Sequence, residues 1–307
     1  MTPLAQISKK LPLGEMARYR MFLAYLHATQ QLARPTAPWR AVPDFLIVGA
    51  QRSGTTTLYR LLAEHPAVRF PRLTKGVHWF DVDYHRGPSW YRAGFPLRSS
   101  IERATRDLGQ RVVVGEAAPY YGFHPFAPAR IAEQLPAVKL VMILRDPVTR
   151  AWSQFHHERA RGYEPLADFG AALAAEEHRL AGAEEVLAGR PGHHLAHQHQ
   201  SYVARGRYDE QIRRLWDAVG RDRVLVLYTE ELERDPGPTL DALHDFIGVE
   251  RRQVEPGRHN PRTKGSLPEE HVATIRAATA ASDAWLAANL PTPPPWLVPA
   301  PVATEAG

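Results

Sequence analysis

The stretch Asp44 to Leu58, DFLIVGAQRSGTTTL, joins a short apolar run to a turn rich in Gly and Thr and then to the start of a helical pattern. Short apolar runs bounded by turn residues are typical of buried parallel strands. The first N–H groups of a helix lack intrahelical partners and lie at the positive end of the helix dipole. The stretch therefore predicts a strand, a loop and a helix N-terminus that together bind a phosphate group.

The turn and the start of the helical pattern comprise Gln51, Arg52, Ser53, Gly54, Thr55, Thr56 and Thr57. The spacing Gly49-x4-Gly54 imitates the P-loop of nucleotide hydrolases, but Thr55 stands where that motif has Lys. The cation of this loop is Arg52 instead. We expect the loop to bind its anion through backbone N–H groups, hydroxyl groups and an arginine.

Composition limits the class of protein. The 307-residue chain has a formal net charge of +5, carried mainly by arginine, which favours anionic ligands. No basic run is interleaved with aromatic residues, so nucleic acid is not expected as a partner. The chain has no cysteine, which excludes disulfides and thiolate metal ligands. We expect a cytoplasmic protein.

The two ends of the chain differ from its middle. Residues 1–42 predict a helical arm whose apolar patch, Met21 to Leu26, is too short to span a bilayer, which needs about 20 apolar residues. We expect this arm to pack on the domain or on a partner, without stable membrane insertion. Residues 291–307 are rich in Pro and Ala and predict an extended or flexible tail.

Residues 43–290 alternate between strand-like and helix-like segments. The expected strands are Phe45–Val48, Arg111–Val114, Lys139–Leu144 and Arg223–Tyr228. The expected helices are Thr55–Glu64, Val148–Arg161, Asp209–Val219, Pro238–Ile247 and Glu269–Asn289. This alternation predicts an α/β fold of three layers, P-loop-like, with a central and mainly parallel sheet flanked by helices. Ligands of such sheets bind at the carboxyl ends of the strands.

A second strand end carries the sequence LRDPVTRAWS, Leu144 to Ser153. Arg145 leaves the expected strand, and Ser153 lies on the helix that follows. Arginine can donate two hydrogen bonds to a phosphate, and serine a further one. A plainer interpretation makes Arg145 and Asp146 a surface ion pair. Two anion-binding strand ends in one sheet instead favour a nucleotide with phosphates at both ends of its ribose.

These motifs resemble the sulfotransferases that use 3′-phosphoadenosine 5′-phosphosulfate (PAPS), over roughly Asp44 to Leu290. Further matching stretches are Lys75–Tyr91, Gly115–Tyr121, Arg205–Tyr208 and Tyr228–Pro236, which look nearer to the glycan (heparan sulfate) branch than to the cytosolic phenol branch. The resemblance implies transfer of a sulfuryl group to a glycan, lipid or secondary-metabolite acceptor, more readily to a hydroxyl than to an amine, with release of the bisphosphate PAP.

The resemblance also assigns the cofactor site. It implies that residues 51–57 hold the 5′-phosphosulfate and that Arg145 and Ser153 hold the 3′-phosphate. A late loop, Arg262, Lys264 and Gly265, is expected to close over the phosphates, and Tyr208 either stacks on adenine or packs in the core. No metal is expected, because a sulfuryl group carries less negative charge than a phosphoryl group.

The same resemblance implies which residues are catalytic. Arg52 is expected to stabilise the charge that develops on the leaving oxygen. Relatives of the glycan type often have a Glu after the lysine that matches Lys75, but this chain has Gly76. His78 is therefore the first candidate for the general base, since imidazole accepts a proton near neutral pH. Alternatively, His78 is a structural residue beneath Trp79.

Other assignments carry less weight. Glu116 is a second candidate for the base and is expected to reach the cleft. Lys75 is expected to contact the sulfate or the acceptor, and Asp81 to orient a neighbour. The histidines His193, His194, His197 and His199 are interpreted as a solvated or acceptor-facing loop rather than a metal site. One or two of the aromatic residues Trp79, Trp90, Tyr91, Tyr120 and Tyr121 are expected to contact an acceptor.

Two alternative functions stay open at this stage. A nucleotide kinase would use a P-loop Lys and a metal-binding acid, of which the first is missing and the second is not evident. A catalytically weak relative that only binds PAP is consistent with Gly76 at the position of the Glu.

Overall fold

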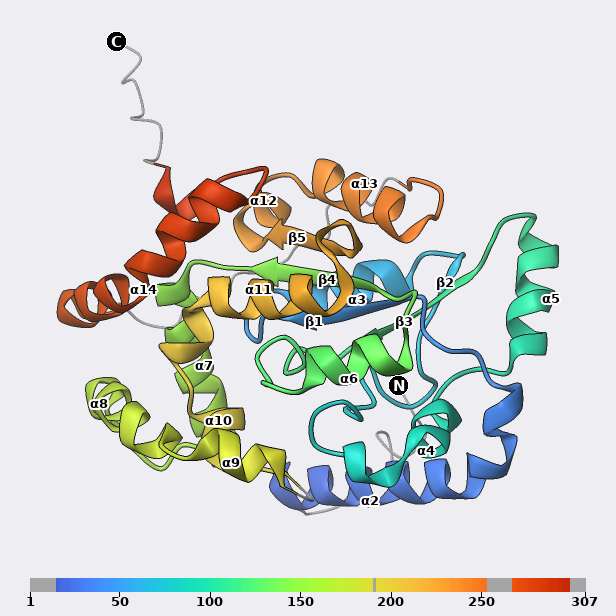
Figure 1. The fold of residues 1–307 in the computed structure, drawn as a ribbon, viewed down its shortest axis with the longest axis horizontal. Helices are drawn as coiled ribbons and strands as arrows, with labels where there is room; N and C mark the ends of the chain where they lie inside the picture. The colour runs from blue at the N-terminus through green and yellow to red at the C-terminus, as the bar shows by residue number, and fades with distance from the viewer. Residues whose placement is uncertain (1–14, 190–191, 253–266, 299–307) are drawn as a thin grey trace, which may run out of the picture.

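The computed structural model describes residues 15–189, 192–252 and 267–298. Within them, the centre of the fold is a sheet of five parallel strands in the order β2-β3-β1-β4-β5 (Figure 1). The strands are β1 (Phe45–Gly49), β2 (Val68–Arg69), β3 (Val113–Ala117), β4 (Lys139–Leu144) and β5 (Val224–Tyr228). Helices connect the strands and flank the sheet, so the predicted α/β fold with a central parallel sheet is confirmed.

The strand β3 differs most from its prediction. The sequence predicts Arg111–Val114, because the Gly and Glu that follow are depleted in strands, whereas the observed strand runs over Val113–Ala117. A Cβ atom at Gly115 would lie 2.2 Å from the Phe45 ring, so glycine lets β3 approach β1. The shift places Glu116 inside a central strand rather than in the loop after it. The two-residue strand β2 was not predicted, since it is too short to show a pattern.

The helices complete the fold. Those after β1 and β2 are α3 (Thr55–Ala63), α4 (Pro88–Ala93) and α5 (Arg98–Leu108); those after β3 and β4 are α6 (Ala127–Gln134), α7 (Pro147–Ala160), α8 (Phe169–Leu180), α9 (Ala183–Ala188), α10 (Leu195–His199) and α11 (Tyr208–Val219); those after β5 are α12 (Thr229–Arg234), α13 (Pro236–Ile247) and α14 (Glu269–Asn289). The five predicted helices appear as α3, α7, α11, α13 and α14, with ends within two residues of the prediction.

Local signals set the ends of these helices. The Asp146 side chain caps the N-terminus of α7, and Gly248, with φ 80°, ends α13.

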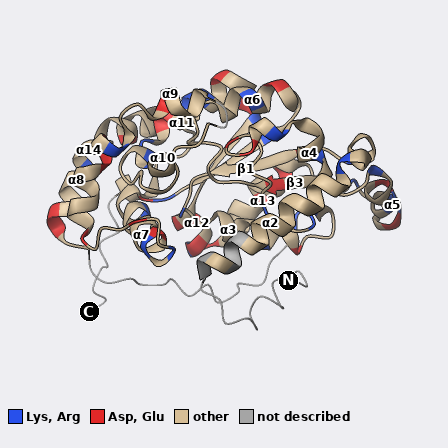
Figure 2. Ribbon diagram, turned by 90° about the horizontal axis from the view of Figure 1, so that it is seen from below, with Lys and Arg blue, Asp and Glu red and all other residues tan. Residues whose placement is uncertain are grey.

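Two hydrophobic layers cover the two faces of the sheet. Phe45 and Ile47 of β1 pack with side chains of α3 and α13, whereas Leu46 and Val48 pack with side chains of α6 and α11. This alternation follows from the two-residue period of a strand. Both faces of β1 are buried, which explains its continuous apolar sequence. Blue and red segments are interspersed on outer helices such as α5 and α6 (Figure 2).

The first described helix, α2 (Glu15–Ala33), leads into the short 3-10 helix η1 (Arg34–Trp39) and packs beside α4 (Figure 1). His27 of α2 contacts the Trp90 ring edge to face, with 5.6 Å between ring centroids. None of the described helices is long and apolar enough to cross a membrane.

At the other end, the expectation of a flexible tail does not hold for residues 291–298. Trp296, in the 3-10 helix η5 (Pro295–Leu297), donates a hydrogen bond of 2.9 Å to Asp283. The Tyr228 hydroxyl donates to the Thr292 carbonyl at 2.8 Å, so this segment packs against β5 and α14. Its many prolines mark an extended chain, and the aromatic side chain of Trp296 attaches that chain to the domain.

Candidate active site

The loop after β1 turns into α3 at the carboxyl edge of the sheet. Arg52 (φ 68°) and Gly54 (φ 84°), which directly precedes α3, both have left-handed backbone conformations. For a residue with a Cβ atom this conformation costs about 1–2 kcal/mol, and such residues concentrate at functional sites. The conformation brings the Arg52 side chain and the first N–H groups of α3 to the same edge. These N–H groups provide the expected anion site.

Basic side chains surround this helix N-terminus. Arg52 Nε donates a hydrogen bond of 3.1 Å to Ser153 Oγ, and Lys75 Nζ donates one of 3.1 Å to Thr56 Oγ1. Burial, followed by the charges of Arg52 and Arg60, lowers the pKa of Lys75 to about 8. The gathered positive charge is therefore unfavourable without an anion. A bound phosphate or sulfate would stabilise the charged form of Lys75.

The loop after β4 carries the residues expected to form the second anion site. The plainer interpretation, a surface ion pair between Arg145 and Asp146, is wrong. Asp146 pairs instead with Arg276 of α14, whose Nη2 donates to Asp146 Oδ2 at 3.0 Å. Among the described residues Arg145 has no ion-pair partner. The Tyr208 hydroxyl donates to the Arg145 carbonyl at 2.7 Å and so fixes its backbone. The half-buried Arg145 guanidinium is thus held at the strand end without an ion pair to any described carboxylate, although its charge acts on Glu230.

A hydroxyl from a third strand end joins these two loops. Thr229, directly after β5, has its Oγ1 atom 2.7 Å from the Ser53 carbonyl oxygen and 2.8 Å from the Leu144 carbonyl oxygen. Together with the Arg52–Ser153 hydrogen bond, this contact places the β1 and β4 loops side by side. The site can therefore bind one ligand that has anionic groups at two ends.

His78 follows Lys75 by three residues, lies within reach of its charge, and has a carboxylate beside it. Its Nδ1 atom is 2.9 Å from Asp81 Oδ2, and its side chain is 37% exposed whereas that of Asp81 is fully buried. Burial lowers the pKa of His78, but the Asp81 carboxylate and the more distant Glu116 outweigh this effect, so the net direction is upward. Because Asp81 accepts the Nδ1 proton, Nε2 of the neutral imidazole is left as a proton acceptor. His78 also has a left-handed backbone, with φ 59°.

Glu116 does not reach the cleft as the sequence predicts. Its side chain is completely buried in β3, where it accepts hydrogen bonds from Val77 N (2.7 Å) and from the hydroxyls of Tyr91 (2.7 Å) and Tyr121 (2.8 Å). Burial raises the pKa of Glu116, and the hydrogen bonds from the two tyrosines oppose this rise. In this position Glu116 holds the backbone beside His78 and has no exposed surface from which to accept an acceptor proton.

The other predicted contacts fall mostly in the core. Tyr208 is completely buried beside Trp296 and has no face free for stacking, so it acts on the site through the Arg145 carbonyl. The expected aromatic platform, Trp79, Trp90, Tyr91, Tyr120 and Tyr121, is also buried, with exposures of 4% or less.

Two of the four histidines, His197 and His199, are used internally, whereas His193 is exposed as expected of a solvated loop. His199 stacks on Tyr163 at 3.8 Å, and His197 Nδ1 lies 2.7 Å from the Tyr120 hydroxyl. Burial, followed by the charge of Arg205, lowers the pKa of His197 to about 2, so this ring is neutral. Within the described residues, no group of three or more His, Cys, Asp or Glu side chains is arranged to hold a metal.

Comparison with known proteins identifies the family that has this arrangement. A family model described as the sulfotransferase domain matches residues 42–262. The chain belongs to the sulfotransferase family. Human bifunctional heparan sulfate N-deacetylase/N-sulfotransferase 3 is 30% identical over 214 residues, which cover 68% of this chain and 22% of that protein. The mouse N-deacetylase/N-sulfotransferase 1 is 30% identical over 212 residues, 67% of this chain and 22% of that protein.

A solved structure supports the same assignment. The sulfotransferase from Alicyclobacillus acidocaldarius is 30% identical, with a TM-score of 0.60 over 81% of this chain and 95% of that chain. The predicted resemblance, including its glycan-type side, is confirmed by these matches. The sulfotransferase chain spans about 22% of the length of the curated relatives it matches.

Gly76 of this sulfotransferase has a structural reason. Its segment runs beside β3, where Ala117 N donates to the Lys75 carbonyl at 2.8 Å. A Cβ atom at Gly76 would lie 2.5 Å from the Ala117 carbonyl oxygen, closer than real Cβ contacts. A glutamate therefore cannot stand at this position without moving the backbone. The local packing therefore explains why glycine stands where a Glu was expected from relatives.

We expect Gly76→Glu to destabilise this sulfotransferase by about 1–3 kcal/mol, as overpacking does, and not to raise its turnover. Gly76→Ala adds the same Cβ atom without the carboxylate and serves as the matched control. Thermal unfolding should show a lower midpoint for both variants. A Gly76→Glu protein with the wild-type midpoint and increased turnover would contradict the assigned packing.

Sequence patterns could not reveal several contacts of the site. Gln51 Nε2 donates to Glu158 Oε1 at 2.9 Å, and Glu158 Oε2 lies 2.9 Å from His199 Nδ1. These residues and Thr229 are far apart in sequence and carry no spacing signal. Three residues predicted to contact the cofactor, Arg262, Lys264 and Gly265, lie outside the described residues.

Proposed function

We propose that this sulfotransferase transfers a sulfuryl group from PAPS to a hydroxyl group, or less readily to an amine, of a glycan, lipid or secondary-metabolite acceptor and releases PAP. The observation that carries the proposal is the junction of two anion-binding strand ends, with Arg52 and Ser153 in hydrogen-bond contact. A nucleotide with phosphate at both ends of its ribose matches two such ends.

The residues present fit PAPS. The left-handed loop at Arg52 and Gly54 directs backbone N–H groups to one anion, and Arg145 has no carboxylate partner among the described residues to compete with a second anion. PAPS supplies the sulfuryl group. Neither strand end has the P-loop Lys that a phosphoryl-transfer enzyme uses, since Thr55 stands in its place.

In the proposed reaction the acceptor oxygen forms a bond to sulfur while the bond from sulfur to the phosphate oxygen breaks. His78 Nε2 takes the acceptor proton, and Asp81 holds the ring in the tautomer that has Nε2 free. The electron pair of the broken bond leaves with the phosphate oxygen, where Arg52 and Lys75 stabilise the negative charge. Arg145 and Ser153 position the ligand from its other end.

The printed names of the curated relatives bear on the acceptor. Both relatives named above are heparan sulfate N-sulfotransferases, so they support an amine on a glycan as an acceptor to test beside hydroxyl groups. Hydroxyl acceptors remain our first expectation because a histidine base has to remove a hydroxyl proton, whereas an uncharged amine attacks before it loses one.

The proposal is tested by incubating the protein with isotopically labelled PAPS and a panel of glycans, lipids and metabolites, and by following label transfer with mass spectrometry. We expect a labelled product that depends on the protein and needs no added metal. Absence of labelled product from every acceptor, together with PAP binding, would support the weak PAP-binding relative instead.

The pH dependence of turnover should reflect the His78–Asp81 pair. Because His78 acts as a base only when neutral, and its pKa is raised, kcat/KM should increase with pH through a value above the ordinary 6.5. In Asp81→Asn the carboxylate that raises this pKa is gone, so the acidic limb should move to lower pH while the plateau rate falls through lost orientation. If the acidic limb of the pH profile of Asp81→Asn stays at the wild-type pH, His78 is not the group that titrates.

A further inference from the structure

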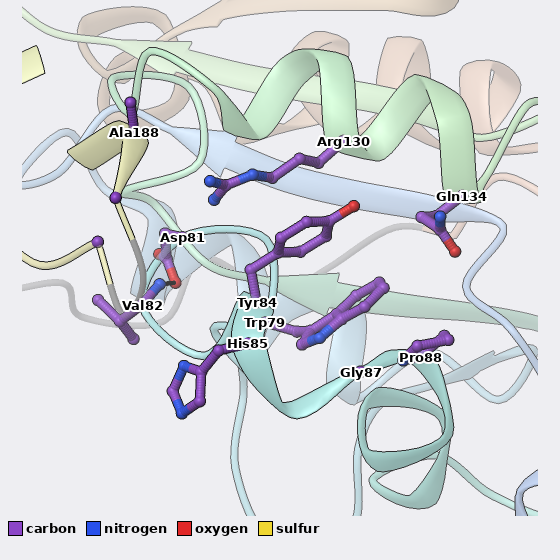
Figure 3. A pocket seen from close by; sticks show the side chains of 12 residues that line it. Trp79, Asp81, Val82, Tyr84, His85, Gly87, Pro88, Arg130, Gln134 and Ala188 are labelled. Atoms are coloured by element: carbon purple, nitrogen blue, oxygen red, sulfur yellow. Dashed lines mark hydrogen bonds between the residues drawn. The ribbon is translucent and has the colours of Figure 1, made fainter. Parts of the chain in front are cut away.

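A cavity of about 410 Å³ lies beside the His78–Asp81 pair. Its walls come from the segment Trp79–Pro88, from α6, and from Ala188, Gly189 and Gly192 at and after the end of α9. Figure 3 shows Trp79, Tyr84, Arg130 and Gln134 around it. The volume is in the range of pockets that hold small organic ligands. Neither anion-binding loop contributes to its lining, so the cavity is separate from the site assigned to PAPS.

Asp81 connects the cavity to the proposed chemistry. Its carboxylate lines the cavity, and its Oδ2 atom is 2.9 Å from His78 Nδ1. Its Oδ1 atom accepts a hydrogen bond of 2.6 Å from Val82 N, so both oxygens already have donors. The cavity therefore meets the candidate base pair at Asp81, since His78 itself does not line it.

Arg130 supplies the positive charge of the cavity. Its Nη1 atom donates to the Phe80 carbonyl at 2.8 Å, and its guanidinium lies 4.3 Å from the centroid of the Tyr84 ring. Figure 3 shows Arg130 extending from α6 along the cavity on the side of Asp81. It forms no ion pair with any described residue. A half-buried guanidinium with one hydrogen bond keeps donors available for a carboxylate or sulfate.

Aromatic rings form the neighbouring wall. The Tyr84 and Trp79 rings lie 5.0 Å apart between centroids and are tilted by 39°. The Trp79 ring is in turn stacked on Tyr91 at 4.9 Å, which fixes it. Flat apolar rings of this kind pack against the face of a sugar or an aryl group. The cavity thus combines an aromatic wall with the Arg130 cation and the Asp81 carboxylate, which already pairs with His78 and Val82 N.

We propose that this cavity binds the acceptor, and that the acceptor has a ring that packs against Tyr84 and an acidic substituent that pairs with Arg130. This inference rests on the proposed function only in naming the ligand as the acceptor. Arg130 is then a specificity-determining residue, which selects acidic acceptors over neutral ones of the same shape.

The test compares ligand pairs that differ only in the acidic group. Binding of p-nitrophenyl β-D-glucuronide and p-nitrophenyl β-D-glucoside is measured by calorimetry in the presence of PAP, beside the aryl pair 4-hydroxyphenylacetate and its amide. The wild-type protein should bind the acidic member of at least one pair about tenfold or more tightly, the value of one charged hydrogen bond. The pair that shows the preference identifies the ring as a sugar or an aryl group.

Arg130→Gln should abolish this preference, and Arg130→Lys should restore part of it. Arg103→Gln removes the same charge from the exposed side of α5 and should leave the preference intact. A preference that persists in Arg130→Gln, or is absent from the wild type for both pairs, would overturn the inference. PAP binding and sulfate transfer are measured separately in the wild-type protein. If both are absent while the preference for acidic ligands is intact, the proposed function is contradicted but the ligand specificity of the cavity is not.

Discussion

Replacement of His78 by alanine is expected to lower turnover by at least about 100-fold, the usual contribution of a general base. The affinity for PAP should stay within about twofold of the wild type, because His78 makes no contact with either anion-binding loop among its hydrogen bonds to described residues. Turnover is followed with labelled PAPS, and PAP affinity by calorimetry. The expected result is thus a loss in kcat without a loss in binding.

Two variants separate chemistry from folding in this experiment. His78→Asn retains a residue type that tolerates the left-handed backbone at φ 59° but cannot act as the base, so it should lose as much turnover as the alanine. His178→Ala removes an exposed histidine from α8 and should change nothing. Wild-type turnover in His78→Ala would exclude His78 as the base and support its alternative role as a packing residue beneath Trp79.

The second large effect is expected at Arg52. Arg52→Ala should lower kcat by about 100- to 1,000-fold, the range found when one preorganised donor to a developing negative charge is removed. PAP affinity should fall much less, since Lys75 and the N–H groups of α3 still surround the 5′ end. Arg52→Lys should restore most of the rate, because lysine keeps a positive charge and a hydrogen-bond donor at this position.

A charge control completes the Arg52 experiment. Arg60 also contributes positive charge near Lys75 but is exposed on α3, so Arg60→Ala should change kcat by no more than about twofold. Equal losses in Arg60→Ala and Arg52→Ala would indicate a general electrostatic effect instead of a specific contact. A loss confined to PAP affinity would assign Arg52 to ground-state binding.

The parts that were predicted from sequence all have local signals. The strand, loop and helix after Asp44, the cap at Asp146 and the apolar runs of β1 and β4 are encoded by neighbouring residues. The family resemblance then assigned roles to Arg52, Arg145 and Ser153, and the structure brings Arg52 and Ser153 together over 101 positions of separation.

The parts that were not predicted depend on contacts between distant segments. Arg276 competes for Asp146 from 130 residues away, and this competition decides that Arg145 has no carboxylate partner among the described residues. The burial of Glu116 follows from the close approach of Gly115 to Phe45, which a strand pattern cannot show. Tyr208 was ambiguous in sequence because the same aromatic residue can pack in a core or stack on a base.

The proposed function requires a site with two anion-binding ends. Calorimetry with PAP, with 5′-AMP, which lacks only the 3′-phosphate, and with ATP and Mg²⁺ tests this claim directly. We predict that PAP binds at least about tenfold more tightly than 5′-AMP without any metal, and that Arg145→Gln removes most of this difference. Equal affinity for PAP and 5′-AMP, or tighter binding of ATP with Mg²⁺, would contradict a two-ended site for PAP.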